Sequence, residues 1–203
     1  VSMRRAAKIL GIHELTVKRK LIYLAKVGRR YQKNLLKSLK GKVEHLQLDD
    51  MISSEHTKLK PLTISLAVDV KKRIILGAEV GRIPAFGHLA DLSRKKYGKR
   101  KNEHKKTLDK LISTIKETVK RDALVESDEH LNYPTAIKKY LSQNPHTRHK
   151  GGRSCIAGQG ELKKLYYDPL FILNHSCAML RANINRLFRK TWCTTKIPEM
   201  LKH

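Results

Sequence analysis

The sequence has few cysteines, few aromatic residues, few acidic residues and no long apolar run. No stretch approaches the roughly 18 consecutive apolar residues of a transmembrane helix, and no apolar segment follows the basic start as in a secretory signal peptide. The 3 cysteines form no C-x-x-C pair, which argues against a disulfide framework and a zinc knuckle. We therefore expect a cytoplasmic protein without a membrane partner.

Acidic residues are far outnumbered by basic ones. The chain of 203 residues holds 44 Lys and Arg against 18 Asp and Glu, which gives a net charge of +26. A charge of this size requires an anionic partner. Basic clusters occur at residues 18–20, 29–30, 94–106, 138–139, 148–153 and 186–190. This dispersed layout favours nucleic acid over one amphipathic membrane anchor, although any single cluster could equally be a solvated face.

Residues 3–25 show two short helical patterns around Gly11. Ala7, Gly11 and Val17 have the offsets of a helix-turn-helix, in which the glycine takes the tight turn. The second helix should begin near residues 13–15 and present a polar face to the major groove of DNA. The residues of that face are Glu14, Thr16, Lys18, Arg19 and Lys20, and the last four are the expected DNA contacts. Two packed helices with no DNA role are the alternative.

The rest of the chain has the pattern of an α/β domain with one ordinary core. Period-two alternation and short apolar runs predict strands, whereas apolar residues at helical spacing predict helices. The predicted strands are 45–53, 62–70, 74–80, 123–128 and about 146–150, and the predicted helices are 102–120, 134–142 and 173–187. We divide the chain into a helix-turn-helix domain (1–28), a linker helix (29–42) and the α/β domain (43–203).

Three acidic residues stand out because acids are scarce and these lie on predicted strands. Asp49 and Asp50 lie in the first strand, and Asp128 ends the fourth. Alternation along a strand sends Asp49 and Asp50 to opposite faces, so only one of them should join a shared site. If the first and fourth strands are neighbours, Asp49 and Asp128 can reach one Mg²⁺ or Mn²⁺ ion, which prefers oxygen ligands. Ordinary ion pairs with nearby lysines are the alternative.

Several segments together resemble the transposases of bacterial insertion sequences, most closely the insertion-sequence-one group. The segments are LDDMISSEHTKLKP, RKKYGKRK, SDEHLNYP, GQGELKK, DPLFILNHSCAMLRANINRL and RKTWCTTK. The resemblance covers about residues 43–196. It implies a ribonuclease-H-like domain with a mixed five-stranded sheet, behind the helix-turn-helix. It also implies cleavage and joining of double-stranded DNA by a metal-binding DDE triad, a homodimer on DNA, and a place at the bacterial nucleoid.

The resemblance also assigns roles to residues of this chain. Asp49 and Asp128 match the first two acids of the triad, and Asn174 stands where the family has Glu. Asp49 would bridge two metal ions, with Asp128 and Asn174 each holding one. Glu161 and Asp168 are the alternative third ligands. Basic residues of the last helix would grip the transposon end, although some of them could equally be solvated; they are Arg181, Arg186, Arg189 and Lys190.

Other types of chemistry find little support in the sequence. The glycines between residues 151 and 160 have no G-K-[ST] motif, so we expect no nucleotide or other small-molecule substrate. No Ser/His/Asp or Cys/His arrangement points to a covalent nucleophile. Two alternative functions stay open. The chain could be a catalytically inactive DNA-binding remnant, since Asn174 replaces an acid, or a ribonuclease-H-like nuclease that acts on RNA hybrids.

Overall fold

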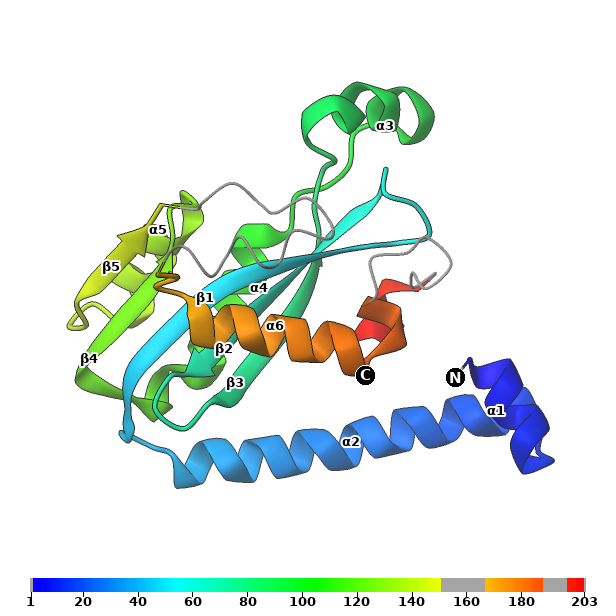
Figure 1. The fold of residues 1–203 in the computed structure, drawn as a ribbon, viewed down its shortest axis with the longest axis horizontal. Coiled ribbons are helices and arrows are strands. Elements are labelled where there is room, and N and C mark those ends of the chain that lie inside the picture. Colours follow the sequence, from blue (N-terminus) through cyan, green and yellow to red (C-terminus); the bar gives the residue numbers. More distant parts are fainter. Residues whose placement is uncertain (1, 151–166, 188–196, 203) are drawn as a thin grey trace.

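The structure is a computed structural model that describes residues 2–150, 167–187 and 197–202 (Figure 1). Three residues of the predicted site lie outside the described residues: Glu161, Arg189 and Lys190. The glycine-rich segment 151–160 also lies outside them.

A mixed sheet of five strands forms the centre of the molecule, in the order β3-β2-β1-β4-β5. The strands are β1 (Val43–Ser54), β2 (Pro61–Asp69), β3 (Ile74–Arg82), β4 (Val119–Asp128) and β5 (His146–His149). β1, β2 and β3 pair antiparallel, while β4 pairs parallel with β1 and with β5. This confirms the predicted α/β class and the three-stranded meander, and the order is compatible with a ribonuclease-H-like fold.

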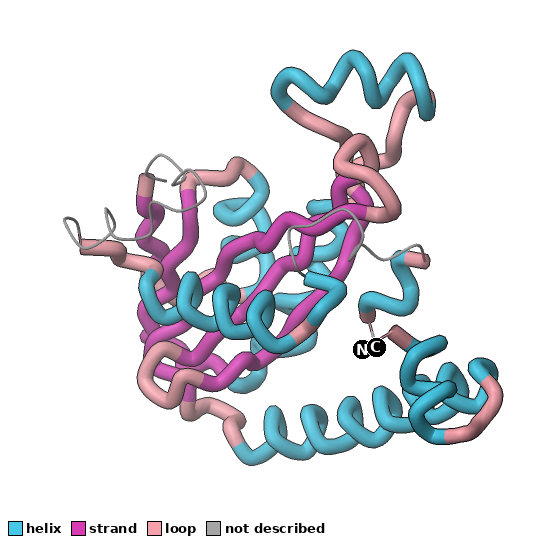
Figure 2. Tube along the Cα trace, turned by 45° about the vertical axis from the view of Figure 1, so that its right-hand side comes forward, coloured by secondary structure: helices cyan, strands magenta, loops and turns pink. Residues whose placement is uncertain are grey.

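Helices cover both faces of the sheet (Figures 1 and 2). The helices of one face are α4 (His104–Ile115) and α5 (Asn132–Tyr140), and the other face is covered by α6 (Phe171–Asn183). Leu46 and Leu48 of β1 belong to the apolar core on the α4 side. Met51 belongs to the core that contains Leu173 and Cys177 of α6. Because successive residues of a strand point to opposite faces, β1 divides its side chains between two cores.

Two predicted helices are too long. The predicted helix 102–120 ends at Ile115 and continues as a 3-10 turn, Lys116–Thr118. Val119 then pairs with Val43 of β1, so a β-branched residue that fits the helical spacing is taken into the sheet. The predicted helix 173–187 ends at Asn183, because Ile184 is extended, and a separate 3-10 turn covers Asn185–Leu187.

The two N-terminal helices are α1 (Met3–Leu10) and α2 (Glu14–Ser38). Gly11 has a φ of 62° in the turn between them, as predicted. The separate linker helix 29–42 is wrong, because α2 runs as one helix of 25 residues from Glu14 to Ser38. Gly28 lies within it, and a single exposed glycine costs a helix only about 1 kcal/mol, which the surrounding helix-forming residues offset. Gln32 fixes α2 to the sheet edge, since its Nε2 donates to the carbonyl of Leu76 at 2.8 Å.

One further helix was not predicted: α3 (Ala90–Tyr97), which follows a 3-10 turn at Gly87–Leu89. Its apolar residues are too few to produce a clear helical period. Among the described residues, none of the helices combines the length and the apolar character of a membrane-spanning segment.

Candidate functional site

Asp49 and Asp128 lie on neighbouring parallel strands and on the same face of the sheet. Leu48 of β1 pairs with Ser127 of β4, and the next residue along each strand is the aspartate. The face is the one covered by α6, because Gln47, two residues before Asp49, contacts α6 directly. The Oε1 of Gln47 accepts a hydrogen bond from the backbone N–H of Leu173 at 3.2 Å. The condition that the first and fourth strands be neighbours is therefore met.

The carboxyl group of Asp49 is in an unfavourable environment for a negative charge. Burial raises its pKa to about 7 despite a hydrogen bond from the backbone N–H of Asp50 at 2.7 Å. The charges of Asp128 and Asp50 raise this pKa further, and Arg181 lowers it. Burial also raises the pKa of Asp128, whose Oδ1 accepts from the backbone N–H of His130 at 3.0 Å. A divalent cation would relieve the repulsion between these two carboxylates, so the pair fits a hard metal ion.

The third predicted ligand, Asn174, has another partner in this structure. Its Nδ2 donates to Oδ2 of Asp168 at 2.9 Å, and Oδ1 of Asp168 accepts from the backbone N–H of Leu170 at 3.1 Å. Asp168 thus holds the start of α6. Within the described parts of the chain, no three Asp, Glu, His or Cys side chains are arranged to hold one metal ion. The structure therefore brings Asp49 and Asp128 together, but it joins Asn174 and Asp168 to each other.

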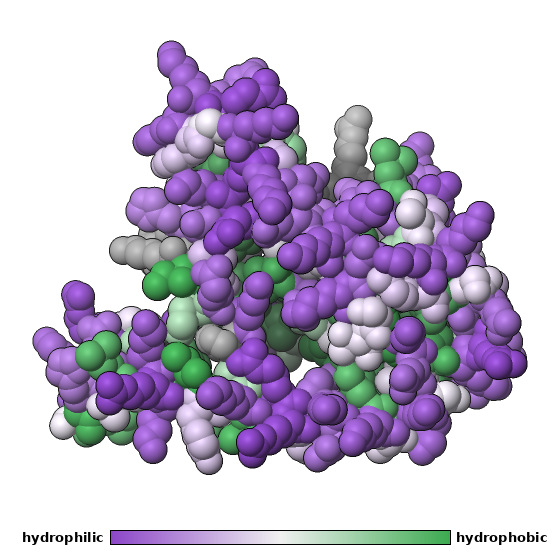
Figure 3. All heavy atoms as spheres, turned by 180° about the vertical axis from the view of Figure 1, so that it is seen from behind, coloured by the Kyte–Doolittle hydropathy of each residue, from purple (hydrophilic) through white to green (hydrophobic). Residues whose placement is uncertain are grey.

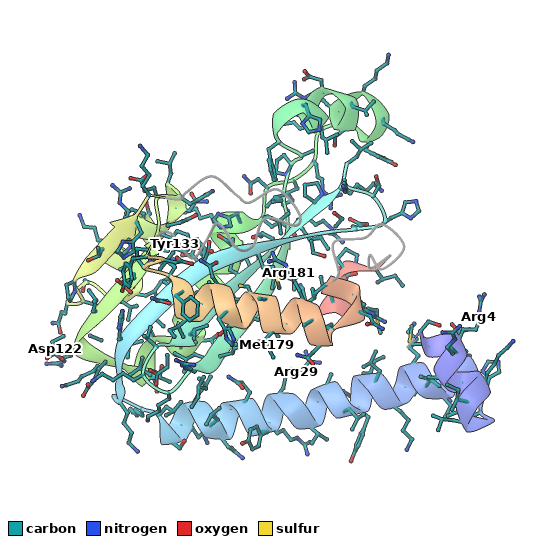
Figure 4. The ribbon with its side chains drawn as sticks, in the orientation of Figure 1. Arg4, Arg29, Asp122, Tyr133, Met179 and Arg181 are labelled. Carbon is teal, nitrogen blue, oxygen red and sulfur yellow. The ribbon has the colours of Figure 1, made fainter. Side chains whose placement is uncertain are left out.

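The basic residues of α6 and the following turn differ in their surroundings. Arg181 lies on the side of α6 nearest β1 and acts electrostatically on Asp49 (Figure 4). Arg186 instead donates from Nη1 to the carbonyl of Met200 at 2.9 Å, which holds the C-terminal turn. Of these two described residues, Arg181 is the one placed to neutralise charge beside Asp49.

Asp50 occupies the opposite face of the sheet, as the alternation predicts, but its buried surroundings were not predicted. Its Oδ1 accepts from the hydroxyls of Thr63 at 2.7 Å and Ser65 at 2.5 Å. Its Oδ2 accepts from Nε2 of His104 at 2.6 Å and from the hydroxyl of Tyr133 at 2.8 Å. Although burial alone would raise it, the pKa of Asp50 is lowered by these hydrogen bonds, with His104 contributing most.

The Asp50 network continues to Asp128. Because Nε2 of His104 donates to Asp50, its Nδ1 accepts from Nδ2 of Asn132, at 2.7 Å. The ring of His104 also contacts the ring of His130 edge-on, with centroids 4.2 Å apart. His130 in turn donates its backbone N–H to Asp128. Contacts on the α4 side thus hold the loop that orients Asp128.

A second cluster that the sequence did not reveal surrounds Glu126. Its Oε2 lies 2.6 Å from Nε2 of His45, and its Oε1 lies 2.9 Å from Nε2 of His149. Gln47 donates from Nε2 to the same carboxylate at 2.9 Å. Burial alone would raise the pKa of Glu126, but the hydrogen bonds lower it, with Gln47 contributing most. The pKa of Glu126 is therefore lowered in the folded protein, whereas that of Asp49 is raised.

The predicted DNA-facing residues lie on the first turns of α2. Arg19 and Lys20 are exposed, and Thr16 and Lys18 are half-buried. His13 caps the helix, since its Nδ1 accepts from the backbone N–H of Leu15 at 3.2 Å. The face therefore presents at least two exposed cations.

Comparisons with known proteins were made for the whole chain. No family model and no curated protein matches it. The function must therefore be argued from the residues themselves. The arrangement offers two carboxylates that can share a cation, one arginine beside them, and a strongly basic chain around them.

Proposed function

We propose that this protein is a DNA transposase of the DDE type, which cleaves and transfers DNA strands at the ends of an insertion sequence. The observation that carries the proposal is the pair Asp49 and Asp128. They lie side by side on parallel strands in a chain of charge +26, and the pKa of Asp49 is raised to about 7. Two adjacent acids without a cation between them are costly, so a role in holding one explains them.

The residues that would hold the metal are Asp49 and Asp128, with Asn174 as the proposed third ligand. A bound Mg²⁺ or Mn²⁺ pair would supply activation of a water or a 3′-hydroxyl and stabilisation of the leaving oxygen. For Asn174 to contribute its carbonyl oxygen, its amide would have to leave Asp168. The backbone N–H of His130 orients the carboxylate of Asp128. Arg181 would attract the phosphate of the DNA strand beside Asp49.

The N-terminal helices support a DNA substrate. α2 carries Lys18, Arg19 and Lys20 in its first two turns, and Gly11 makes the turn that brings α1 against it. A helix-turn-helix of this kind places its second helix in the major groove. We expect the two element ends to be held by a homodimer on DNA, because transposition joins both ends to one target.

The proposal is tested by nicking of a supercoiled plasmid in Mn²⁺ with the wild type, Asp49→Ala, Asp128→Ala and Asp122→Ala. Asp122 is the matched control, since it lies on the same strand as Asp128 but is mostly exposed, and its carboxylate pairs with Lys120 at 3.8 Å (Figure 4). We expect nicking by the wild type and Asp122→Ala, and a loss of at least a hundredfold in the other two variants. Equal nicking by all four proteins would end the assignment.

A second candidate is a DNA-binding protein that no longer catalyses the reaction. It is favoured by the hydrogen bond between Asn174 and Asp168 and by the lack of a third acidic ligand among the described residues. In that case the wild type would bind duplex DNA but would not nick it. The variant Asn174→Glu would then restore nicking, since it supplies the acid that the family carries at this place.

A further inference from the structure

The segment between β3 and α4 forms a projection from the body of the molecule. β3 ends at Arg82 and α4 begins at His104, and residues 83–103 between them include α3. α3 stands away from the sheet in both views (Figures 1 and 2). We call residues 83–103 the arm, and we call residues 55–60, which join β1 to β2, the hairpin tip.

The arm is fixed to the hairpin tip by specific polar contacts. The hydroxyl of Ser93 donates to the carbonyl of Leu59 at 2.7 Å. Arg100 donates from Nη2 to Oε2 of Glu55 at 2.8 Å, and both side chains are largely buried, with 13% and 18% exposed. The ammonium of Lys60 lies 4.4 Å from the centre of the Tyr97 ring. The arm and the hairpin tip therefore form one unit rather than two loose loops.

Burial of apolar surface does not explain why the arm is there. Ser93 is the one buried residue of α3, while Leu92 is 53% exposed and Phe86, just before α3, is 63% exposed. What the arm presents is positive charge, and its surface is mainly hydrophilic (Figure 3). It has six Lys and Arg against two acids. Its exposed cations are Arg94, Lys95, Lys96, Lys99 and Lys101, and Lys58 of the hairpin tip is exposed beside them.

The position of the arm relates it to the candidate site. Asp49 lies on β1, the hairpin tip directly follows the end of that strand at Ser54, and Glu55 follows Asp49 by six residues. At about 3.3 Å per residue, the tip begins roughly 20 Å from Asp49 along the strand. A DNA duplex that reaches Asp49 and runs along β1 would therefore pass the arm within one helical turn of the reacting phosphate.

We propose that the arm and the hairpin tip bind the phosphate backbone of duplex DNA on one side of the candidate site. This inference rests on the proposed function, because DNA at Asp49 is what brings a duplex to the arm. A row of exposed lysines on a fixed support contacts phosphates without reading bases. The arm thus adds affinity and orientation, while α2 is the element placed to read sequence.

The test is the salt dependence of binding to a random duplex of about 24 base pairs, measured by fluorescence anisotropy. The NaCl concentration runs from about 50 to 200 mM, a range over which the affinity of a protein with several phosphate contacts falls steeply. The arm variant is Lys95→Ala, Lys96→Ala and Lys99→Ala together. The matched control removes the same charge from exposed positions at the opposite end of the sheet: Lys72→Ala, Lys116→Ala and Arg121→Ala. A third variant changes Lys18, Arg19 and Lys20 to Ala.

We expect the arm variant to lose about tenfold or more in affinity at 100 mM salt, and its slope of log K against log salt to fall by roughly 0.9 for each lost phosphate contact. The control should keep the wild-type slope. An arm variant that matches the wild type, or a control that loses as much as the arm variant, would overturn the inference. If only the α2 variant loses affinity, the inference fails while the proposed function stands. A wild type that does not bind the duplex at all would refute both.

Discussion

Asp49 and Asp50 are adjacent aspartates in opposite environments, so the same substitution should have opposite effects on stability. Asp50→Asn replaces a carboxylate that accepts four hydrogen bonds. An amide is neutral and has only one acceptor oxygen, so the two donors that would face its NH2 group lose their acceptor, at roughly 1.5–3 kcal/mol each before the hydroxyls reorient. We expect the free energy of unfolding to fall by about 2–4 kcal/mol, a large part of the total for a domain.

Asp49→Asn should instead stabilise the protein in the absence of metal. Folding raises the pKa of Asp49 from its ordinary value of 3.8 to about 7. An acid with a raised folded pKa destabilises the folded state at every pH above its unfolded pKa, and the penalty grows until the pH passes the folded pKa. At pH 8 the penalty approaches about 4 kcal/mol by this relation, and solvent screening reduces it to about 2–4 kcal/mol.

The assay is unfolding in urea in the presence of EDTA, with the m-value compared between variants. At pH 8 the two variants should lie on opposite sides of the wild type. The gain of Asp49→Asn should fall by more than half at pH 5, since Asp49 in the folded protein is then mostly protonated. Equal destabilisation by both substitutions, or a gain that does not depend on pH, would refute the reasoning that separates these two residues.

Two further predictions concern residues outside the candidate site. Gly28→Ala should stabilise the protein by about 0.5–1 kcal/mol, because an added Cβ at Gly28 meets nothing within 4 Å. Gly81→Ala should destabilise the protein by roughly 1–3 kcal/mol, because its Cβ would collide with the Thr107 hydroxyl. Thermal unfolding of both variants tests these two predictions, and a stabilised Gly81→Ala variant would contradict the second. Cys177 is 5% exposed, and burial raises the pKa of its thiol to about 12. Iodoacetamide at pH 8 should therefore leave Cys177 unmodified in the native protein and alkylate it in urea, which peptide mass mapping measures. Rapid labelling of Cys177 in the native protein would contradict its burial.

The sequence was sufficient for the elements whose pattern is set by one local rule. Strict alternation predicted β2 and β3 to within one or two residues, and the same rule placed Asp49 and Asp50 on opposite faces. Where helical spacing and strand pairing both fit a segment, the sequence did not predict the correct boundary. Val119 fits both the helical spacing of α4 and the pairing of β4, and the sheet prevails because Val43 is already there as a partner.

The partners of the acids could not be predicted, because they are distant in sequence. His104 follows Asp50 by 54 residues and Tyr133 follows it by 83. Neither residue carries a local signal, since a histidine or tyrosine on an amphipathic helix is most often a core residue. One signal was present: alternation already directed Asp50 toward a helix-covered face, and a buried carboxylate requires donors. The third ligand could not be settled in this way, because it depends on the path of α6 relative to β1.

The pKa shifts of three acids separate the candidate site from the structural hydrogen-bond networks around it. Asp50 and Glu126 are each surrounded by donors that lower their pKa, so the fold has already satisfied their charges. Asp49 lies next to Asp50 in sequence, yet burial raises its pKa to about 7 despite the hydrogen bond from the backbone N–H of Asp50. Under the proposed function, a divalent cation held by Asp49 and Asp128 would supply the favourable charge that offsets the burial of Asp49.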